Sequence, residues 1–302
     1  MKSFIWAFAF SIFPTILYAQ VGSIINLGVV KSKYASGYNV DVWLPANYSA
    51  SKQYAVIYMH DGQMLFDSTT TWNKQAWMVQ NVVANLMAEN KIVPAIIIAI
   101  HNNGQSRHAD YTPQIPFKKL KRQQQTAMYH DTTAYGNNVF ANFKVNSDNY
   151  LKFLVNELKP LIDKRFSTYT DKSQTIIMGS SMGGLISLYA ICQYPEIFGK
   201  AACMSTHWPL VFKTDNNPFP DAMLQYLIGK LPQPESHMLY FDMGTMGIDS
   251  LYESTQIQVD ALCIDIGYNS NNFMSVVFEG ADHNEKAWHK RLHIPLQFLL
   301  KP

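Results

Sequence analysis

The chain has 302 residues, of which 48% are hydrophobic and 15% are charged, and its formal net charge is +2. A chain of this size and composition can bury one large core, which excludes an intrinsically disordered protein. The near-neutral charge gives no reason to expect a nucleic acid partner or binding to an anionic surface.

The first segment, residues 1–19, is typical of a secretory signal peptide. Lys2 precedes an apolar stretch that ends at Ala19, which resembles a signal-peptidase site before Gln20. The alternative is a membrane anchor, but the stretch contains Pro14 and is shorter than the roughly 20 residues that a spanning helix needs. We therefore expect cleavage and a secreted or periplasmic chain without stable membrane insertion.

Apolar runs rich in β-branched residues alternate with segments of helical period along the rest of the chain. This pattern predicts an α/β fold with a mostly parallel sheet and helices on both faces. The expected strands are residues 39–45, 54–62, 94–102, 175–180, 200–206, 237–244 and 272–280. The expected helices are residues 72–90, 147–166, a segment after residue 181, 254–268 and 285–300. Without a repeat or a low-complexity linker, residues 20–302 are expected to form one domain, and the oligomeric state stays open.

Residues 101–146 fit this alternation least well, because they are polar and carry the basic run "KKLKRQQQ". We interpret them as an inserted loop or lid. A basic run of this kind is usually a solvated face, although a role with an anionic substrate stays open.

The three cysteines, Cys192, Cys203 and Cys263, lie in apolar stretches. They are too few and too odd in number for a disulfide scaffold, so we expect buried thiols. None has metal-type spacing, and the sequence lacks CxxC, HExxH and an EF-hand loop, so no metal is expected.

The stretch "TIIMGSSMGGLISLYA" places G-x-S-x-G, residues 179–183, between an expected strand and an expected helix. A sharp turn there strains the central residue and needs small neighbours. It would lift the Ser181 hydroxyl to the helix N-terminus and aim the Met182 amide at a developing oxyanion. The motif alone is also compatible with a plain glycine-rich turn.

A nucleophilic serine needs a histidine base, which in such a fold follows the last strand. His283 comes directly after the run 272–280 and before the C-terminal helix. His289 and His293 fall inside that helix and are expected to be packing or surface residues. His283 is therefore the candidate base.

The carboxylate that orients the histidine should lie between the serine and the histidine in the chain. Asp249, in the loop after an expected strand, is favoured over Asp242, which lies within the strand pattern, and Glu253 is a remote third choice. Ser181, Asp249 and His283 then stand in the order typical of a serine hydrolase triad.

The second oxyanion donor should come from the loop after an earlier strand, where the sequence reads "YMHDGQMLFD". Gly62 allows the backbone to turn its amides inward, and we assign the donor to Gly62 or Gln63, favouring Gln63. His60 and Asp61 are interpreted as a pair that braces the loop.

The segments "YMHDGQMLFD", "GSSMGGLISLYA", "STHWP", "DMGT" and "EGADHNEKAWHKRLHIPLQFLL" resemble the esterase family of α/β hydrolases that contains esterase D, feruloyl esterases and enterochelin-type siderophore esterases. The resemblance covers nearly the whole mature chain and supports Ser181 as nucleophile and His283 as base. Asp249 matches less closely, because some siderophore esterases of the group rely on a Ser-His pair. The resemblance implies an α/β-hydrolase fold and hydrolysis of a small-molecule or carbohydrate-linked ester without a cofactor.

Trp208, directly after "STH", is a candidate for stacking an aromatic acyl group or a sugar, and the alternative is that it packs beneath the expected lid. Two other functions stay open. One is an acyltransferase of the same fold, and the other is a non-catalytic binding protein on a hydrolase scaffold.

Overall fold

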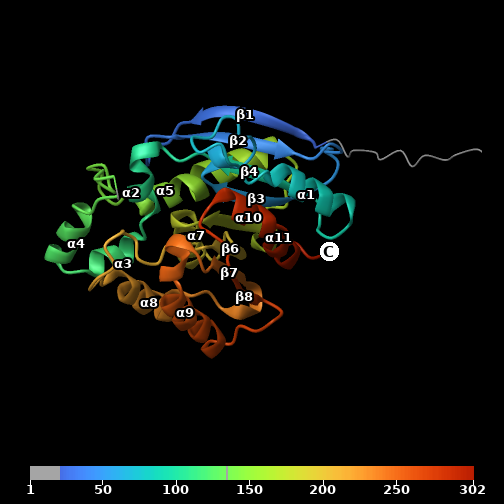
Figure 1. Cartoon of the computed structure of the whole chain (residues 1–302). Coiled ribbons are helices and arrows are strands. Elements are labelled where there is room, and N and C mark those ends of the chain that lie inside the picture. The colour runs from blue at the N-terminus through green and yellow to red at the C-terminus, as the bar shows by residue number, and fades with distance from the viewer. Residues whose placement is uncertain (1–20, 134) are drawn as a thin grey trace, which may run out of the picture.

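A computed structural model describes residues 21–133 and 135–302, so the expected signal peptide lies outside the described residues. Its centre is an eight-stranded sheet of order β1-β2-β4-β3-β5-β6-β7-β8 (Figure 1). The strands are β1 (Ser23–Val30), β2 (Tyr38–Leu44), β3 (Ala55–His60), β4 (Ala95–Ile100), β5 (Thr175–Ser180), β6 (Lys200–Met204), β7 (Met238–Gly244) and β8 (Phe273–Phe278). The pairs β1–β2 and β2–β4 are antiparallel, and the five other neighbouring pairs are parallel. The predicted α/β fold with a mostly parallel sheet is confirmed.

Helices cover both faces of this sheet. They are α1 (Val79–Ala88), α2 (Arg107–Tyr111), α3 (Gln114–Lys119), α4 (Arg122–Tyr129), α5 (Ser147–Phe153), α6 (Lys159–Arg165), α7 (Met182–Gln193), α8 (Phe219–Lys230), α9 (Glu253–Asp265), α10 (Glu285–Arg291) and α11 (His293–Leu299). The C-terminal segment α10–α11 lies beside α1 in Figure 1. No helix within the described ranges combines the length and apolar character needed to cross a membrane.

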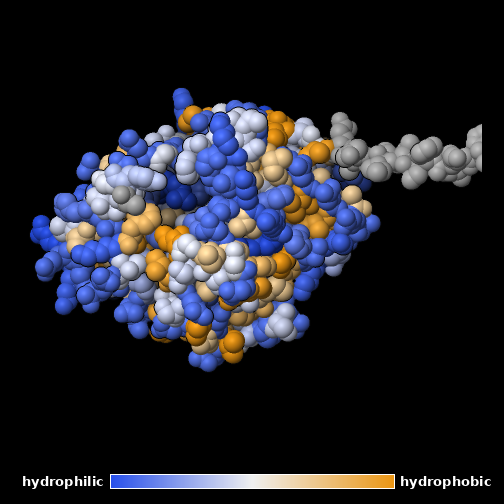
Figure 2. Space-filling view, viewed as in Figure 1, coloured by the Kyte–Doolittle hydropathy of each residue, from blue (hydrophilic) through white to orange (hydrophobic). Residues whose placement is uncertain are grey.

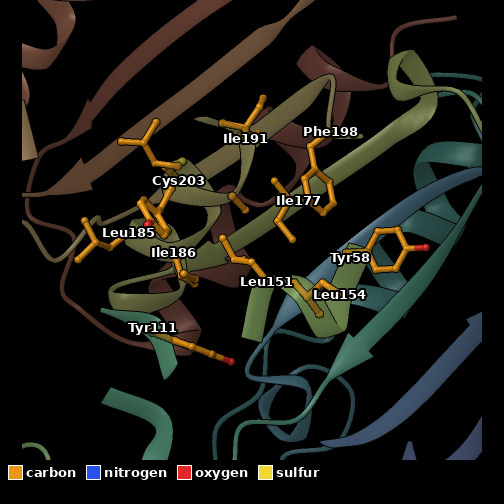
Figure 3. Close-up of a cluster of buried hydrophobic side chains, with 14 of the residues drawn as sticks. Tyr58, Tyr111, Leu151, Leu154, Ile177, Leu185, Ile186, Ile191, Phe198 and Cys203 are labelled. Atoms are coloured by element: carbon orange, nitrogen blue, oxygen red, sulfur yellow. The ribbon is translucent and has the colours of Figure 1, made fainter. Parts of the chain in front are cut away.

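Two apolar cores follow from the alternation of side chains along the strands. Val56 and Tyr58 of β3 point into one core, which holds residues of α5, α7, α8 and α9, whereas Ile57 and Met59 point into the other, which holds residues of α1 and α11. Figure 3 shows Ile177 of β5 among the side chains of the first core. The central strands are therefore buried on both faces, as their continuous apolar runs predict.

The first strand, β1, was not expected from the sequence. It lies at the sheet edge, and its residues are mostly exposed or half-buried, with an irregular register between Asn26 and Gly28. An edge strand needs no continuous apolar run, which explains why that criterion does not detect it.

The expectation of an inserted loop at residues 101–146 needs correction. The segment forms α2, α3 and α4, and its residues Tyr111, Phe117 and Phe140 are fully buried in the first core. Its basic run is exposed at Lys118 and Lys119, and Figure 2 shows a mainly hydrophilic surface in the region of α4. The segment thus packs into the first core and has one solvated face.

Two smaller expectations also have clear outcomes. The expected helix 72–90 begins only at Val79, because Lys74 and Met78 adopt left-handed backbone angles that interrupt a helix. The three cysteines are buried free thiols, as predicted.

Candidate active site

The turn between β5 and α7 is sharp and strained at its central residue. Ser181 has φ 57° and ψ −124°, a conformation that a residue with a side chain rarely adopts. A Cβ atom added to Gly179 would lie 2.8 Å from the carbonyl carbon of Gly183, so the two arms of the turn approach too closely for a larger residue. This is the physical reason for Gly179, whereas a Cβ added to Gly183 would lie 3.3 Å from the side chains of His60 and Asp61.

The end of β6 and the loop after it hold this turn in place. The Ser181 amide donates a hydrogen bond to the carbonyl of Met204 at 2.9 Å, and the His207 amide donates one to the carbonyl of Ser181 at 3.2 Å. Both sides of the peptide backbone at Ser181 are therefore fixed by neighbouring chain segments, which stabilises the strained conformation.

Asp249 lies in the 3₁₀ turn Gly247–Leu251 and is completely buried. One carboxylate oxygen bonds to Nδ1 of His283, and the other accepts hydrogen bonds from the Ser205 hydroxyl and the Gly244 amide, both at 2.6 Å. Burial alone would raise the pKa of Asp249, but the bonds from His283, Ser205 and Gly244 outweigh it and hold the pKa below its ordinary value. The carboxylate is thus kept ionised against the imidazole.

Asp242, the alternative acid, has a different set of partners. Its Oδ1 accepts a hydrogen bond from Nη2 of Arg291 at 2.9 Å, and its Oδ2 accepts one from the Tyr240 hydroxyl at 3.0 Å. Burial raises the pKa of Asp242 although Arg291 opposes the shift. Among its hydrogen bonds within the described chain, none goes to His283. The geometry therefore favours Asp249 as the partner of the imidazole, while Glu253 is exposed at the start of α9.

His283 lies in the loop between β8 and α10, with its ring edge-on to Trp288 at a centroid distance of 5.0 Å. Its Nδ1 is engaged by Asp249, which leaves Nε2 for the cavity. The other two candidate histidines lie elsewhere, since Nδ1 of His289 is 2.7 Å from the carbonyl of Trp77 and His293 is exposed.

Ser181 and His283 line the same cavity, which has a volume of about 560 Å³. The lining also includes Gln63 and an ion pair between Asp61 and Arg107, in which both N–O distances are 2.7 Å. Burial would raise the pKa of Asp61, but Arg107 outweighs it and holds the pKa low. Other lining residues include Trp72, Asn73, Gln75, Asn102, Glu285 and Trp288.

The two expected sources of oxyanion donors lie close to this cavity. Met182 is the first residue of α7, where amides have no acceptor within the helix. Gln63 lines the cavity, whereas Gly62 is buried against the end of β4, where an added Cβ would lie 2.7 Å from the backbone of Ala99. Gly62 is therefore required by close packing, and the donor roles remain predictions.

The family of the chain follows from its match to the family described as "Putative esterase", which spans residues 34–298. The chain belongs to this family. Its curated relatives include the ferri-bacillibactin esterase BesA of Bacillus subtilis, which is 24% identical over 189 residues covering 59% of this chain and 58% of the relative. An endo-1,4-beta-xylanase/feruloyl esterase of Xylanibacter ruminicola is 26% identical over 170 residues, covering 53% of this chain and 18% of the relative.

These alignments leave a large part of each relative unmatched, since this chain covers between 18% and 62% of the length of the first four curated relatives. Among solved structures, an IroE-like serine hydrolase of Shewanella oneidensis has a TM-score of 0.66 at 17% identity, with 92% of this chain and 80% of that chain covered. This likeness shows the α/β-hydrolase fold.

Trp208 does not line the cavity of this esterase-family chain. Its side chain is 1% exposed, its Nε1 donates a hydrogen bond to Oε1 of Gln256 at 3.1 Å, and its ring stacks on Phe241. Trp208 is therefore a packing residue of the first core, and its burial leaves no surface for stacking on a substrate.

Sequence reasoning missed two residues that the fold brings to the cavity. Trp72 comes from the loop that was expected to be helical and is 83% exposed, and Arg107 comes from the segment that was expected to be a loop. Local sequence holds no signal for Arg107, because its partner Asp61 is 46 residues away.

Proposed function

We propose that this chain is a secreted serine esterase that hydrolyses carboxylic esters with Ser181 as nucleophile, His283 as base and Asp249 as the acid that orients the base. The observation that carries the proposal is the Asp249–His283 hydrogen bond beside a strained serine, with His283 and Ser181 on the wall of one cavity. Membership of an esterase family supports the same chemistry.

The reaction proceeds in two acyl-transfer steps. The Ser181 oxygen attacks the ester carbonyl while Nε2 of His283 takes the serine proton, and collapse of the tetrahedral intermediate breaks the bond to the alcohol, which leaves with that proton. Water then attacks the acyl-serine, gives one proton to His283, and the acid leaves as Ser181 regains its hydrogen. Asp249 stays ionised and stabilises the imidazolium in both steps.

The negative charge of each tetrahedral intermediate forms on the former carbonyl oxygen. In our proposal the amides of Met182 and Gln63 donate to it, since Met182 opens α7 and Gln63 lines the cavity. Loss of one such donor typically lowers the rate by about 100-fold or more.

The residues that line the cavity support the proposal that the ester substrate carries a sugar or another ring rich in hydroxyl groups. Trp72 presents an exposed aromatic side chain, and the same cavity is lined by amide and carboxylate groups, with Asn73 Nδ2 donating to Oε2 of Glu285 at 2.8 Å. Aromatic faces stack on rings while planar polar groups bond to hydroxyls. The relative named a feruloyl esterase supports an ester with an aromatic acyl group, and the relative named a ferri-bacillibactin esterase supports ester hydrolysis in general.

Hydrolysis of a small panel tests the proposal: p-nitrophenyl acetate, methyl ferulate, acetylated xylan and a catecholate trilactone. Wild type should cleave at least one member and react with a fluorophosphonate probe, and Ser181→Ala should do neither. Ser187→Ala is the matched control, because this buried serine lies on the same helix and bonds only to the carbonyl of Gly183 in the described structure. Activity retained by Ser181→Ala would overturn the assignment.

The alternatives have their own readouts. An acyltransferase would convert more substrate to a new ester than to free acid when an acceptor alcohol is added. Secretion is tested by the N-terminus of the protein recovered outside the cytoplasm, which should be Gln20.

A further inference from the structure

Glu285 is a buried carboxylate on the wall of the candidate active-site cavity. It is the first residue of α10 and is 8% exposed, and it lines the same cavity as Ser181 and His283. Burial of a carboxylate is costly unless hydrogen-bond donors or cations replace the water that it loses. The partners of Glu285 therefore indicate what else this side chain can bind.

These partners occupy only one of the two carboxylate oxygens. Oε2 of Glu285 accepts a hydrogen bond from Nδ2 of Asn73 at 2.8 Å, and within the described residues no donor bonds to Oε1. Asp61, another carboxylate that lines the cavity, is paired with Arg107, whereas no cation of the described chain lies at ion-pair distance from Glu285. Oε1 can therefore accept a hydrogen bond from a molecule in the cavity.

Asn73 is held in the orientation that this arrangement needs. Its Oδ1 accepts a hydrogen bond from the Gln75 amide at 3.1 Å, so Nδ2 is the atom that faces Glu285. The loop that carries Asn73 also packs on α10, where the ring of Trp77 stacks on that of Trp288 at a centroid distance of 5.4 Å. Oε2 of Glu285 thus belongs to the contact with this loop, and Oε1 is the atom left for the cavity.

The place of Glu285 beside the base assigns it to the alcohol half of the ester. Asn284 has extended backbone angles, φ −156° and ψ 166°, so the side chains of His283 and Glu285 point to the same side. In the proposed mechanism Nε2 of His283 gives its proton to the alcohol oxygen, which must lie within hydrogen-bond distance of that nitrogen. Further hydroxyl groups of the alcohol then come into the part of the cavity that Glu285 lines.

A different set of contacts holds the loop that carries the expected oxyanion donor. The Asn102 amide donates a hydrogen bond to Oε1 of Gln63 at 3.2 Å, and Nδ2 of Asn102 donates to Oδ1 of Asp61 at 2.7 Å. Neither bond involves Glu285 or Asn73. A change at Glu285 should therefore leave the oxyanion loop in place.

We propose that Glu285 is a specificity-determining residue for the alcohol half of the ester. Its Oε1 accepts a hydrogen bond from a hydroxyl group of a polyhydroxylated alcohol, and Asn73 is a positioning residue that holds Oε2. A carboxylate only accepts, so it selects an alcohol that has a further hydroxyl to donate, and such charge-assisted bonds are the stronger ones. The proposal rests on the proposed esterase function and adds which half of the substrate is recognised.

Glu285→Gln tests the proposal with two acetate esters, 6-O-acetylglucose and ethyl acetate, which form the same acetyl-enzyme. Because Asn73 presents a donor, the new glutamine must turn its oxygen to Asn73 and its NH2 group to the cavity. The ratio of kcat/KM for the sugar ester to kcat/KM for ethyl acetate should fall about 10-fold relative to wild type, the lower end of the effect of one hydrogen bond to a charged group. The intrinsic reactivity of each ester cancels in this comparison.

Glu253→Gln is the matched control. Glu253 is also the first residue of its helix, α9, but it is exposed and does not line the cavity. The same change of side chain and charge should leave the ratio for the two esters at its wild-type value. A fall of the ratio in this variant as well would overturn the assignment to Glu285.

Asn73→Ala separates positioning from direct contact with the alcohol. Alone it should lower the same ratio by a smaller factor, about 3-fold, and added to Glu285→Gln it should cause no further loss, because it acts only through that carboxylate. Independent, multiplicative losses would overturn the positioning role of Asn73.

Acetylcholine distinguishes recognition of hydroxyl groups from attraction of a cation. If Glu285→Gln lowers kcat/KM for acetylcholine more than for 6-O-acetylglucose, the carboxylate serves as a counter-charge and the proposal is overturned. An unchanged ratio in Glu285→Gln, or a wild type that turns over p-nitrophenyl acetate but not the sugar ester, would refute the role of Glu285 while the esterase proposal stands. Absence of both turnover and fluorophosphonate labelling in wild type would instead refute the esterase function itself.

Discussion

Acidification from pH 7 to pH 5 should destabilise the chain through three histidines that are buried without charge. Burial lowers the pKa of His60 and of His108 to about 3, with the Arg107 guanidinium adding to the shift at His108. Burial also lowers the pKa of His207 well below its ordinary value. Nε2 of each ring is buried without a hydrogen-bond partner in the described ranges.

The sign and the size follow from proton linkage. Between pH 6.5 and the folded-state pKa, the unfolded chain binds a proton that the folded chain does not, so stability falls as the pH falls. With an unfolded pKa of about 6.5, each histidine costs roughly 2 kcal/mol between pH 7 and pH 5. Asp61 and Asp249, whose pKa values are lowered, lose their stabilising contribution only below about pH 4.

Urea unfolding at pH 7, 6 and 5 measures this effect by comparing variants. His108→Phe should reduce the loss of stability between pH 7 and pH 5 by about 2 kcal/mol, since the His108 ring already packs edge-on against Phe140. Tyr268→Phe is the control, because it removes a buried hydroxyl that donates to the Pro232 carbonyl and leaves every histidine in place. Its loss of stability relative to wild type should be the same at every pH in this range. If His108→Phe and wild type lose equal stability between pH 7 and pH 5, the histidine is not held neutral and the reasoning is refuted.

Four substitutions test the site further. Asp249→Asn should lower kcat about 1,000- to 10,000-fold with little change in Tm. Asp242→Asn should cost about 3–5 kcal/mol in urea unfolding and spare most of kcat, because it removes the carboxylate nearest to buried Arg291 and leaves that guanidinium only the Ser205 hydroxyl at 2.8 Å and the Asp249 carboxylate at 4.0 Å. Gly179→Ala should abolish fluorophosphonate labelling and lower the yield of folded protein, because its Cβ collides with the facing backbone. Trp72→Ala should raise KM roughly 3- to 10-fold for methyl ferulate and leave kcat for p-nitrophenyl acetate and Tm unchanged, as its side chain is 83% exposed.

The sequence predicted those parts of the fold that are determined by residues close together in the chain. β3, β4, β5, β6 and β7 are buried almost throughout, so each is a mainly apolar run, although Asp242 lies within β7. The turn at Ser181 has a local signal as well, since the backbone at Gly183 approaches Gly179 too closely for a side chain at residue 179. β1 could not be recognised in this way, because a mostly exposed edge strand carries no such run.

The choice of acid shows where local reasoning ends. Asp242 lies in β7, and Asp249 lies in the turn after this strand, seven positions later in the chain. What separates them in the structure is Arg291, which comes from α10 and binds Asp242, while the imidazole of His283 binds Asp249. The loop position of Asp249 alone favoured it as the acid. The residue that binds Asp242, Arg291, lies 49 residues further along the chain.

The arrangement of loops at the carboxyl edge of the sheet explains why the remaining site residues are harder to predict from the sequence. Each parallel strand delivers its following loop to that edge, so residues after β3, β5, β6, β7 and β8 meet there although they are far apart in sequence. A base or a nucleophile can still be found, because its chemistry demands a residue type at a strand end. Arg107 has no such requirement, since an arginine also serves as an ordinary surface residue. Only its ion pair with Asp61, which follows β3, shows that Arg107 belongs to the cavity lining, and the 46 residues between the two partners keep that pairing out of any local pattern.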